Sequence, residues 1–354
     1  MSNAPFITIA GRRIAVDQHP YVIAEMSANH NRNIENAFKI IEAAQKSGAD
    51  AVKLQTYRPD TITLNSESED FRIHGGLWDG RTLYELYEEA HMPWDWHAPL
   101  FAHARKVGIT IFSSPFDHTA VDLLESLNAP AYKIASFEAV DLPLIKYVAS
   151  TGKPMIISTG MANAQEIQEA VEAAREGGCK ELAILHCVSG YPAPAQDYNL
   201  RTIPDLSERF GLVTGLSDHT LDNTTAITSV AMGASIIEKH FTLSRCGGGP
   251  DDSFSLEPAE LAALCKDSKT AWAALGRVDY GRKSSEEGNA QFRRSLYFVK
   301  DMKVGEVITP DAVRSVRPGF GAPPKYLHRV IGRVLREDVT ANSPVTEKTV
   351  GSWV

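Results

Sequence analysis

The chain has 354 residues, 43% of them hydrophobic, which is enough for one large domain with a buried core and a second, smaller domain. Its net charge of -8, without any run of lysine or arginine, argues against a nucleic-acid partner and favours a small-molecule site. No stretch of about eighteen apolar residues is present and residues 1–11 lack the features of a signal peptide, so we expect a cytoplasmic protein without a membrane span.

From residue 21 to about residue 276, short apolar strands alternate with amphipathic helical segments, the pattern of a parallel sheet covered by helices. Several of these helices end in glycine or asparagine, which tolerate the left-handed conformation at a helix C-terminus. Eight strand-helix units predict a (β/α)8 TIM barrel, and the lack of GxGxxG after the first strand argues against a dinucleotide-binding open sheet. The predicted strands are residues 21–27, 51–57, 110–115, 131–136, 154–159, 182–189, 212–217 and 235–241.

Two regions interrupt this pattern. Residues 60–93, rich in charged and aromatic side chains, form an insertion after the second strand, and a long barrel loop of this kind often covers a site. Residues 280–292 are polar and are expected to link a barrel domain, residues 1–279, to a separate domain, residues 293–354. In that last domain short strand-like runs are broken by glycines and prolines, which predicts a small and irregular β structure.

Polar residues end or follow the predicted barrel strands. In a TIM barrel the C-terminal ends of the strands meet at one face, where active sites are built. Apolar strands do not normally end in lysines and carboxylates, because a buried charge without a partner is costly. The convergence therefore predicts a site at this face. Its members are Glu25, Asn29, His30, Lys53, Gln55, Ser114, Lys133, Ser136, Glu138, Ser158, His186, Ser189, Tyr191, Ser217, Asp218, His219, Glu238 and His240.

Two histidines suggest a metal ion. His219 and His240 follow the seventh and eighth predicted strands, which we expect to be parallel neighbours, with Glu25 nearby on the first strand. Both imidazoles would emerge at one end of the sheet and could share one metal ion. The alternative is that each is a hydrogen-bonded core residue, the more frequent role of a single histidine. His186 precedes Cys187 in an apolar run, and we expect both to be structural.

Two lysines indicate a binding site for an anion. Lys53 and Lys133, on the second and fourth strands, suit a phosphate and carboxylate pocket if hydroxyl groups from neighbouring strand ends complete the hydrogen bonds. The alternative is that the lysines only neutralise Glu25 and Glu138. The hydroxyl groups in question belong to Ser114, Ser136 and Ser158.

The order of these motifs resembles that of the sialic acid synthase family, phosphoenolpyruvate-condensing enzymes with a TIM barrel and a small C-terminal antifreeze-like (SAF, β-clip) domain. The similarity covers essentially the whole chain. Because the motifs occur in the same order along the whole chain, the similarity is far more specific than a shared barrel fold. The motifs are IAE at 23–25, VKLQT at 52–56, YKIAS at 132–136, ISTGM at 157–161, LSDHT at 216–220, EKHF at 238–241 and VRPG at 316–319.

Within this family, residues 77–87, 189–194 and 248–258 are most similar to the pseudaminic acid synthases. Ser189 stands where neuraminate-type enzymes carry an asparagine that touches the sugar. The resemblance therefore implies 2,4-diacetamido-2,4,6-trideoxy-altrose as the sugar substrate. The alternative is N-acetylneuraminate or legionaminate synthesis from a mannosamine-type sugar.

The resemblance implies a transferase reaction. Phosphoenolpyruvate, the aldehyde of an open-chain N-acetylated amino sugar, and water give a nine-carbon nonulosonic acid and phosphate. His219 and His240 would hold a divalent metal that polarises the aldehyde, manganese being expected, with magnesium or cobalt as alternatives. Glu25 is the first choice for the acid or base, and Glu138 the second. The implied phosphoenolpyruvate-binding residues are Lys53, Ser114, Lys133, Ser136, Ser158, Ser189 and Ser217.

The resemblance also implies the sugar contacts, which would come from Gln55, Tyr191 and Asp251. Arg317 is expected to reach the barrel of a partner subunit in a domain-swapped homodimer, where its planar fork binds the sugar. The alternative is that VRPG only forms a turn.

Two rival hypotheses stay open. The first is another phosphoenolpyruvate-condensing barrel, or a metal-dependent aldolase that uses pyruvate. The second is a carbohydrate-binding protein whose SAF domain binds the sugar. The second leaves the polar residues at the barrel strand ends without an explanation.

Overall fold

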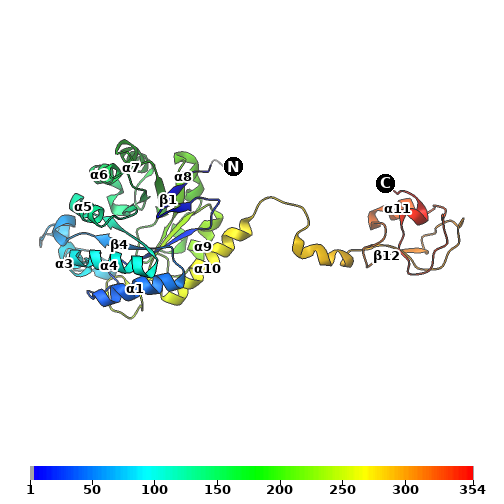
Figure 1. Cartoon of the computed structure of the whole chain (residues 1–354), viewed down its shortest axis with the longest axis horizontal. Coiled ribbons are helices and arrows are strands. Elements are labelled where there is room, and N and C mark those ends of the chain that lie inside the picture. Colours follow the sequence, from blue (N-terminus) through cyan, green and yellow to red (C-terminus); the bar gives the residue numbers. More distant parts are fainter. Residues whose placement is uncertain (1–3, 354) are drawn as a thin grey trace. The chain divides into compact units, whose positions relative to one another are not determined.

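Eight parallel strands close into a barrel in the order β10-β3-β4-β5-β6-β7-β8-β9. The computed structural model describes residues 4–353, and the chain divides into two compact units between Gly276 and Arg277. The helices of the first unit, here called the barrel unit, lie around the sheet in Figure 1. The predicted TIM barrel is confirmed. No helix among the described residues is long and apolar enough to cross a membrane.

The predicted strands begin and end within two residues of the observed ones. The barrel strands are β3 (Tyr21–Glu25), β4 (Ala51–Thr56), β5 (Thr110–Pro115), β6 (Tyr132–Ile134), β7 (Met155–Ser158), β8 (Leu182–Cys187), β9 (Val213–Asp218) and β10 (Ile236–His240). The surrounding helices are α1 (Ile34–Ser47), α4 (Trp94–Val107), α5 (His118–Ser126), α6 (Leu142–Ser150), α7 (Ala164–Glu176), α8 (Thr202–Phe210), α9 (Thr224–Ala231) and α10 (Pro258–Leu275).

Local signals fix where the helices begin and end. The Asn163 side chain accepts hydrogen bonds from the backbone N–H groups of Gln165 and Glu166 at the start of α7. The Glu166 carboxylate accepts from the Asn163 N–H in return, which completes a capping box. Helix α1 ends at Gly48, whose φ of 87° lies in the left-handed region that glycine adopts without strain. Each helix therefore stops where the chain must turn back into the sheet.

A hairpin that the sequence analysis did not predict closes the N-terminal end of the barrel. Strands β1 (Ile7–Ile9) and β2 (Arg12–Ile14) pair antiparallel, and their isoleucines are fully buried. They pack with the first residues of the barrel strands, Tyr21 and Ile236 among them, in one apolar cluster. This end of the barrel is filled with hydrocarbon, and the polar C-terminal ends of the parallel strands lie at the opposite face.

The insertion after β4 contains more structure than the loop that we predicted. It holds α2 (Pro59–Ile62), two 3-10 turns, and α3 (Leu83–Ala90), which begins with a capping box between Thr82 and Glu85. The Trp78 indole N–H donates to the Pro250 carbonyl at 3.3 Å, which ties the insertion to the segment after β10. The insertion is thus tied to the segment after β10 as well as to β4, which it follows.

The second unit has its own core. Strands β11 (Ser295–Phe298) and β12 (Val313–Val316) pair antiparallel, and Leu296 and Phe298 are buried in an apolar cluster that contains residues of this unit alone. Two short helices, α11 (Leu327–Val330) and α12 (Glu347–Val350), complete it. The predicted linker, 280–292, contains the 3-10 helix η6 (Ser284–Phe292).

Candidate active site

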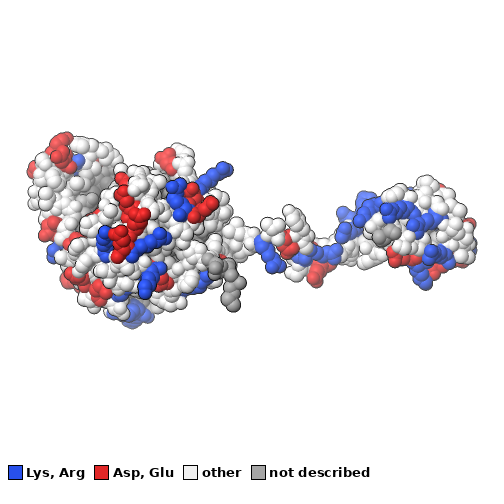
Figure 2. All heavy atoms as spheres, turned by 90° about the horizontal axis from the view of Figure 1, so that it is seen from above, with Lys and Arg blue, Asp and Glu red and all other residues white. Residues whose placement is uncertain are grey.

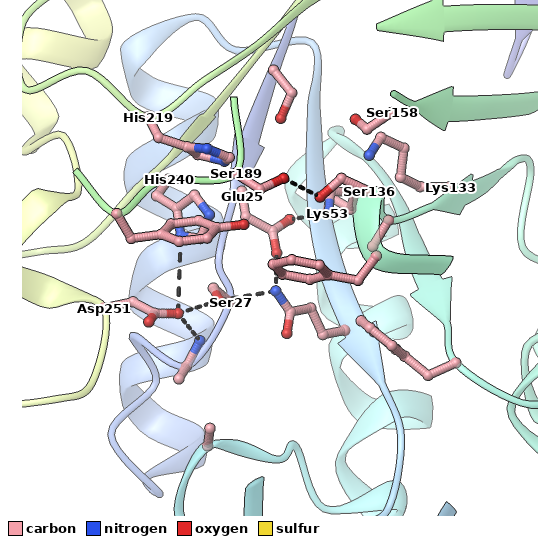
Figure 3. A pocket seen from close by; sticks show the side chains of 18 of the residues that line it. Glu25, Ser27, Lys53, Lys133, Ser136, Ser158, Ser189, His219, His240 and Asp251 are labelled. Atoms are coloured by element: carbon pink, nitrogen blue, oxygen red, sulfur yellow. Dashed lines mark hydrogen bonds and ion pairs between the residues drawn. The ribbon is translucent and has the colours of Figure 1, made fainter. Parts of the chain in front are cut away.

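A cavity of about 360 Å³ opens at the C-terminal face of the barrel, and residues on or just after all eight strands line it. Figure 3 shows its labelled side chains pointing toward one another. Ser114 is placed differently: it does not line the cavity, and its hydroxyl accepts a hydrogen bond from Lys53 Nζ at 3.2 Å. Arg317 belongs to the second unit. Asn29, His30 and Asp218, which we also predicted at this face, do not line the cavity. The other residues to which the family resemblance assigned a role all line it: Glu25, Lys53, Gln55, Lys133, Ser136, Glu138, Ser158, Ser189, Tyr191, Ser217, His219, His240 and Asp251.

Four buried charges form the floor of the cavity. Lys53 Nζ lies 2.8 Å from Glu25 Oε2 and 3.6 Å from Glu238 Oε1, and Lys133 Nζ lies 3.6 Å from the same Glu238 oxygen. None of the four residues is more than 5% exposed. We call these residues the charge quartet. Two positive and two negative groups balance, so each charge has a partner that offsets part of its desolvation cost.

The pKa values of the groups in the charge quartet are shifted in different directions. Burial lowers the pKa of Lys53, but the Glu238 and Glu25 carboxylates outweigh it and raise that pKa. Burial raises the pKa of Glu238, yet the two lysines outweigh it and lower the pKa. For Lys133 burial dominates and the pKa is lowered. Lys133 is therefore the cation whose charge is least compensated, and an added anion would stabilise it.

Serine hydroxyl groups line the cavity together with the two lysines. Ser158 is 1% exposed, and its Oγ has no hydrogen-bond partner among residues 4–353. The hydroxyls of Ser136 and Ser189 lie 2.8 Å apart. A Cβ at Gly160 would lie 2.3 Å from the Cβ of Ser136 and 2.6 Å from Ser189 Oγ, so only glycine fits beside this pair. Figure 3 shows Ser158 beside Lys133, and a buried hydroxyl without a partner in a cavity that contains two cations is the arrangement of a site for an anion.

His219 directly follows β9 and His240 ends the neighbouring β10, as predicted, and their ring centroids are 5.4 Å apart. His219 Nδ1 lies 2.8 Å from the Val188 carbonyl oxygen, which can only accept, so this nitrogen carries the proton and Nε2 keeps its lone pair. Burial lowers the pKa of His219 to about 4 and lowers that of His240 well below its ordinary value. His240 Nδ1 has no hydrogen-bond partner within the described part of the chain. Both rings are neutral near pH 7.

The pair fits a metal ion in its donor chemistry. Neutral imidazole nitrogens bind transition metals, and a buried nitrogen without a partner has a lone pair or proton to satisfy. Among residues 4–353, no group of three or more His, Cys, Asp or Glu side chains is placed to hold an ion together. Two protein ligands would leave the remaining positions to substrate or water, as at catalytic metal sites.

A hydrogen-bonded chain fixes Glu25. The Gln55 side-chain amide donates to Glu25 Oε1 at 2.9 Å and to Ser27 Oγ at 3.0 Å, and the Ser27 hydroxyl donates to Asp251. Glu138 is held less firmly: its Oε2 has no partner in the described structure, and burial raises its pKa to about 7. Glu138 is therefore the carboxyl group that exchanges its proton near neutral pH.

Successive side chains of β10 point to opposite faces of the sheet, and our sequence analysis did not distinguish those that face the cavity from the one that faces outward. Glu238 and His240 face the cavity, whereas Lys239 between them faces outward. Lys239 Nζ donates to Asp218 Oδ2 at 2.9 Å and to the carbonyls of Thr220 and Asp222 at 2.8 Å each. This buried ion pair holds the segment that carries His219. We gave Glu238 no role, although its position two residues before His240 places it on the same face.

Two other residues also departed from expectation. Cys187, expected to be structural, lines the cavity. Ser27, absent from the predicted set, connects Gln55 to Asp251. His186 does not line the cavity, and its Nε2 bonds to the Tyr198 carbonyl, which agrees with the structural role that we expected.

A closed TIM barrel that presents two lysines, several serines and two neutral histidines at its strand ends defines a barrel enzyme acting on an anionic small molecule. Known proteins identify the family. The model of the NeuB family matches residues 40–280, and that of the SAF domain matches residues 293–350. The chain belongs to this family, the sialic acid synthases, which confirms the family predicted from its motifs.

Individual relatives cover nearly the full length. The chain is 43% identical to the pseudaminic acid synthase of Campylobacter jejuni, over 94% of its own length and 96% of the relative's. It is 35% identical to an N,N'-diacetyllegionaminic acid synthase of the same species, with coverages of 92% and 98%. The crystal structure of the N-acetylneuraminic acid synthetase from Leptospira borgpetersenii superposes with a TM-score of 0.72 at 29% identity, covering 81% of this chain and 95% of that one. The chain is an enzyme of this family.

The raised pKa of Glu138 gives a prediction for stability. Because the folded-state pKa is about 7, above the ordinary 4.5, the protonated carboxyl is favoured by folding, and this stability is present below pH 4.5 and lost as the pH rises through 7. Glu138→Gln should therefore stabilise the protein more at pH 8 than at pH 5, by on the order of 1–3 kcal/mol. Thermal unfolding at both pH values measures this.

The matched control is Glu172→Gln, which changes an exposed carboxylate on α7. Its effect on the melting temperature should be the same at both pH values. Equal effects of Glu138→Gln at pH 5 and pH 8 would contradict the raised pKa.

Proposed function

We propose that this enzyme condenses phosphoenolpyruvate with open-chain 2,4-diacetamido-2,4,6-trideoxy-altrose and water, giving pseudaminic acid and phosphate. The observation that carries the proposal is the joint presence, in one cavity, of an under-compensated cation, Lys133, and a pair of neutral histidines. The first suits an anion with a carboxylate and a phosphate, and the second suits a metal that activates an aldehyde. The similarity to pseudaminic acid synthases supports the choice of sugar.

Phosphoenolpyruvate is proposed to lie against Lys133 and Lys53. Lys133 has the less compensated charge, and the free Ser158 hydroxyl can donate to an anionic oxygen. The Ser136 and Ser189 hydroxyls, held 2.8 Å apart, would add two donors. Ser217 bonds to Glu238 and would contact the substrate only by exchanging that partner. Ser114 would act indirectly, through its hydrogen bond with Lys53.

His219 and His240 are proposed to hold a divalent metal, most suitably manganese, because nitrogen donors combined with oxygen donors from substrate or water suit that ion. When bound, the metal would act as a Lewis acid on the aldehyde. The Tyr191 ring lies 4.3 Å from the ring of His219 and 5.9 Å from that of His240. This contact would keep bulk water away from the aldehyde end of the sugar.

Two carboxyl groups are proposed for proton transfer. The new bond joins carbon 3 of phosphoenolpyruvate to the aldehyde carbon, water adds to carbon 2, and the bond from carbon 2 to the phosphate oxygen breaks. Glu25, oriented by Lys53 and Gln55, is proposed to take the proton of the attacking water. Glu138, with a pKa of about 7, is proposed to give its proton to the new alkoxide.

Phosphate release tests the proposed function. Purified enzyme with manganese should release inorganic phosphate only when both phosphoenolpyruvate and the bis-acetamido sugar are present, and mass spectrometry should detect the nine-carbon acid. Pyruvate in place of phosphoenolpyruvate should give no product, which separates this reaction from that of an aldolase. Faster turnover of N-acetylmannosamine or of the legionaminate precursor would reject the choice of sugar.

The metal has its own test. Chelation should stop phosphate release and manganese should restore it. His219→Ala and His240→Ala should each lose turnover and bound manganese, whereas His103→Ala, which removes a histidine of α4 paired with Glu42, should keep both. Full activity of either cavity variant would refute the assignment.

A domain-swapped homodimer is proposed to bring Arg317 to the partner's site. Residues 277–354 contain 14 lysines and arginines against 9 acidic residues, whereas residues 1–276 contain 22 against 35. Figure 2 shows the basic side chains gathered on the visible face of the second unit. These opposite net charges favour association of the second unit of one chain with the barrel unit of another.

Arg317 is exposed, and the turn that carries it is fixed from behind. The Gly319 N–H donates to the Gln291 carbonyl at 3.1 Å, and the Ser295 hydroxyl donates to the Pro318 carbonyl at 2.6 Å. Because the backbone of this turn is already ordered, binding through the guanidinium would cost mainly the rotamer freedom of the Arg317 side chain. This favours a role of Arg317 in binding over the alternative that the VRPG segment only forms a turn.

Mixing subunits tests whether the site is shared. Arg317→Ala and His219→Ala subunits, each inactive alone, should regain about a quarter of wild-type activity after equal mixing, because half the dimers would contain one complete site. Each variant re-mixed with itself is the control. Heterodimers shown by mass to have formed, yet without activity, would refute sharing.

A further inference from the structure

The cavity has an apolar end that the charge quartet and the histidines do not explain. Five residues form it: Tyr57 after β4, Phe116 after β5, Ile62 in α2, and Leu86 and Ala90 in α3. The Tyr57 and Phe116 rings meet edge to face at 5.2 Å. Tyr57 is 2% and Leu86 is 7% exposed, and Phe116, Ile62 and Ala90 are half-buried. We call these five residues the apolar end.

The barrel order places Phe116, one member of the apolar end, across the mouth from His219. Strand β5 lies four strands from β9 in either direction around the closed barrel, so Phe116 and His219 follow opposite strands. An open-chain six-carbon sugar whose aldehyde is at His219 and His240 must extend away from them. Its last carbons would therefore reach the apolar end.

Chemistry then decides which sugars fit. A hydroxyl group placed against hydrocarbon loses its hydrogen bonds to water and gains none in return, whereas a methyl group gains from burial. Of the five residues only Tyr57 carries a hydrogen-bonding atom, its phenol hydroxyl, and the side chains of the other four carry none. The apolar end is thus complementary to a sugar that finishes in a methyl group and lacks the terminal hydroxyl.

We propose that the apolar end is the specificity-determining contact for carbon 6, and that it selects 6-deoxy amino sugars over sugars with a 6-hydroxyl. The inference rests on the proposed condensation reaction and adds to it the group that the enzyme recognises farthest from the reacting carbon. The insertion at residues 60–93 has by this account a second role besides covering the site. It contributes three of the five residues.

Two synthetic sugars that differ only at carbon 6, one with a methyl and one with a hydroxymethyl group, test the proposal. The wild-type enzyme should prefer the 6-deoxy sugar by roughly 10- to 100-fold in kcat/KM, the range expected for one hydroxyl in an apolar pocket. Ile62→Asn should reduce the preference to about threefold or less, because its amide can bond to the hydroxyl. Ala90→Ser, a smaller change, should reduce it in the same direction.

The matched control is Leu64→Asn, in the same insertion but 67% exposed and outside the cavity wall, which should keep the wild-type preference. Equal turnover of both sugars by the wild type, or an unchanged preference in both Ile62→Asn and Ala90→Ser, would overturn the inference and leave the condensation reaction intact. Absence of phosphate release with either sugar would instead overturn the proposed function, and the inference with it.

Discussion

The buried balance of charge at the floor of the barrel is the constraint on which the rest of the site depends. Lys53 bridges Glu25 and Glu238, and Glu238 in turn is shared with Lys133. Removing Lys53 would leave Glu25 buried without a charge partner, and removing Glu238 would do the same to Lys133, which costs about 3–5 kcal/mol in either case. The same arrangement leaves Lys133 under-compensated, so a site that is stable when empty still favours an anion.

Because successive side chains of a strand point to opposite faces, two sets of ion pairs lie on different sides of the sheet at the same end of the barrel. On β10, Glu238 and His240 face the cavity while Lys239 faces outward, and β9 provides Asp218 to pair with Lys239. The outer pair holds the segment that follows β9, and the inner set stays available for ligands. The register of two parallel strands, rather than a flexible loop, thus fixes the positions of Glu238 and His240.

Much of this could be predicted from the sequence, because buried parallel strands and glycine stops leave strong local patterns. The pairing of His219 with His240 followed from strand order alone. The N-terminal hairpin was missed because each of its strands has three residues, too few for a period to appear. The displacement of Ser114 from the cavity, and the sharing of Glu238 between two lysines, depend on three-dimensional packing that no local pattern records.

Direct binding of phosphoenolpyruvate tests the central claim, that Lys133 is the under-compensated cation of the anion site. Calorimetric titration in the presence of manganese should show that Lys133→Met weakens binding by at least about 30-fold, the effect of losing a buried charge partner. Lys146→Met, which removes an exposed lysine of α6, should bind like the wild type. A folded Lys133→Met enzyme that binds phosphoenolpyruvate within about twofold of the wild type would contradict the account.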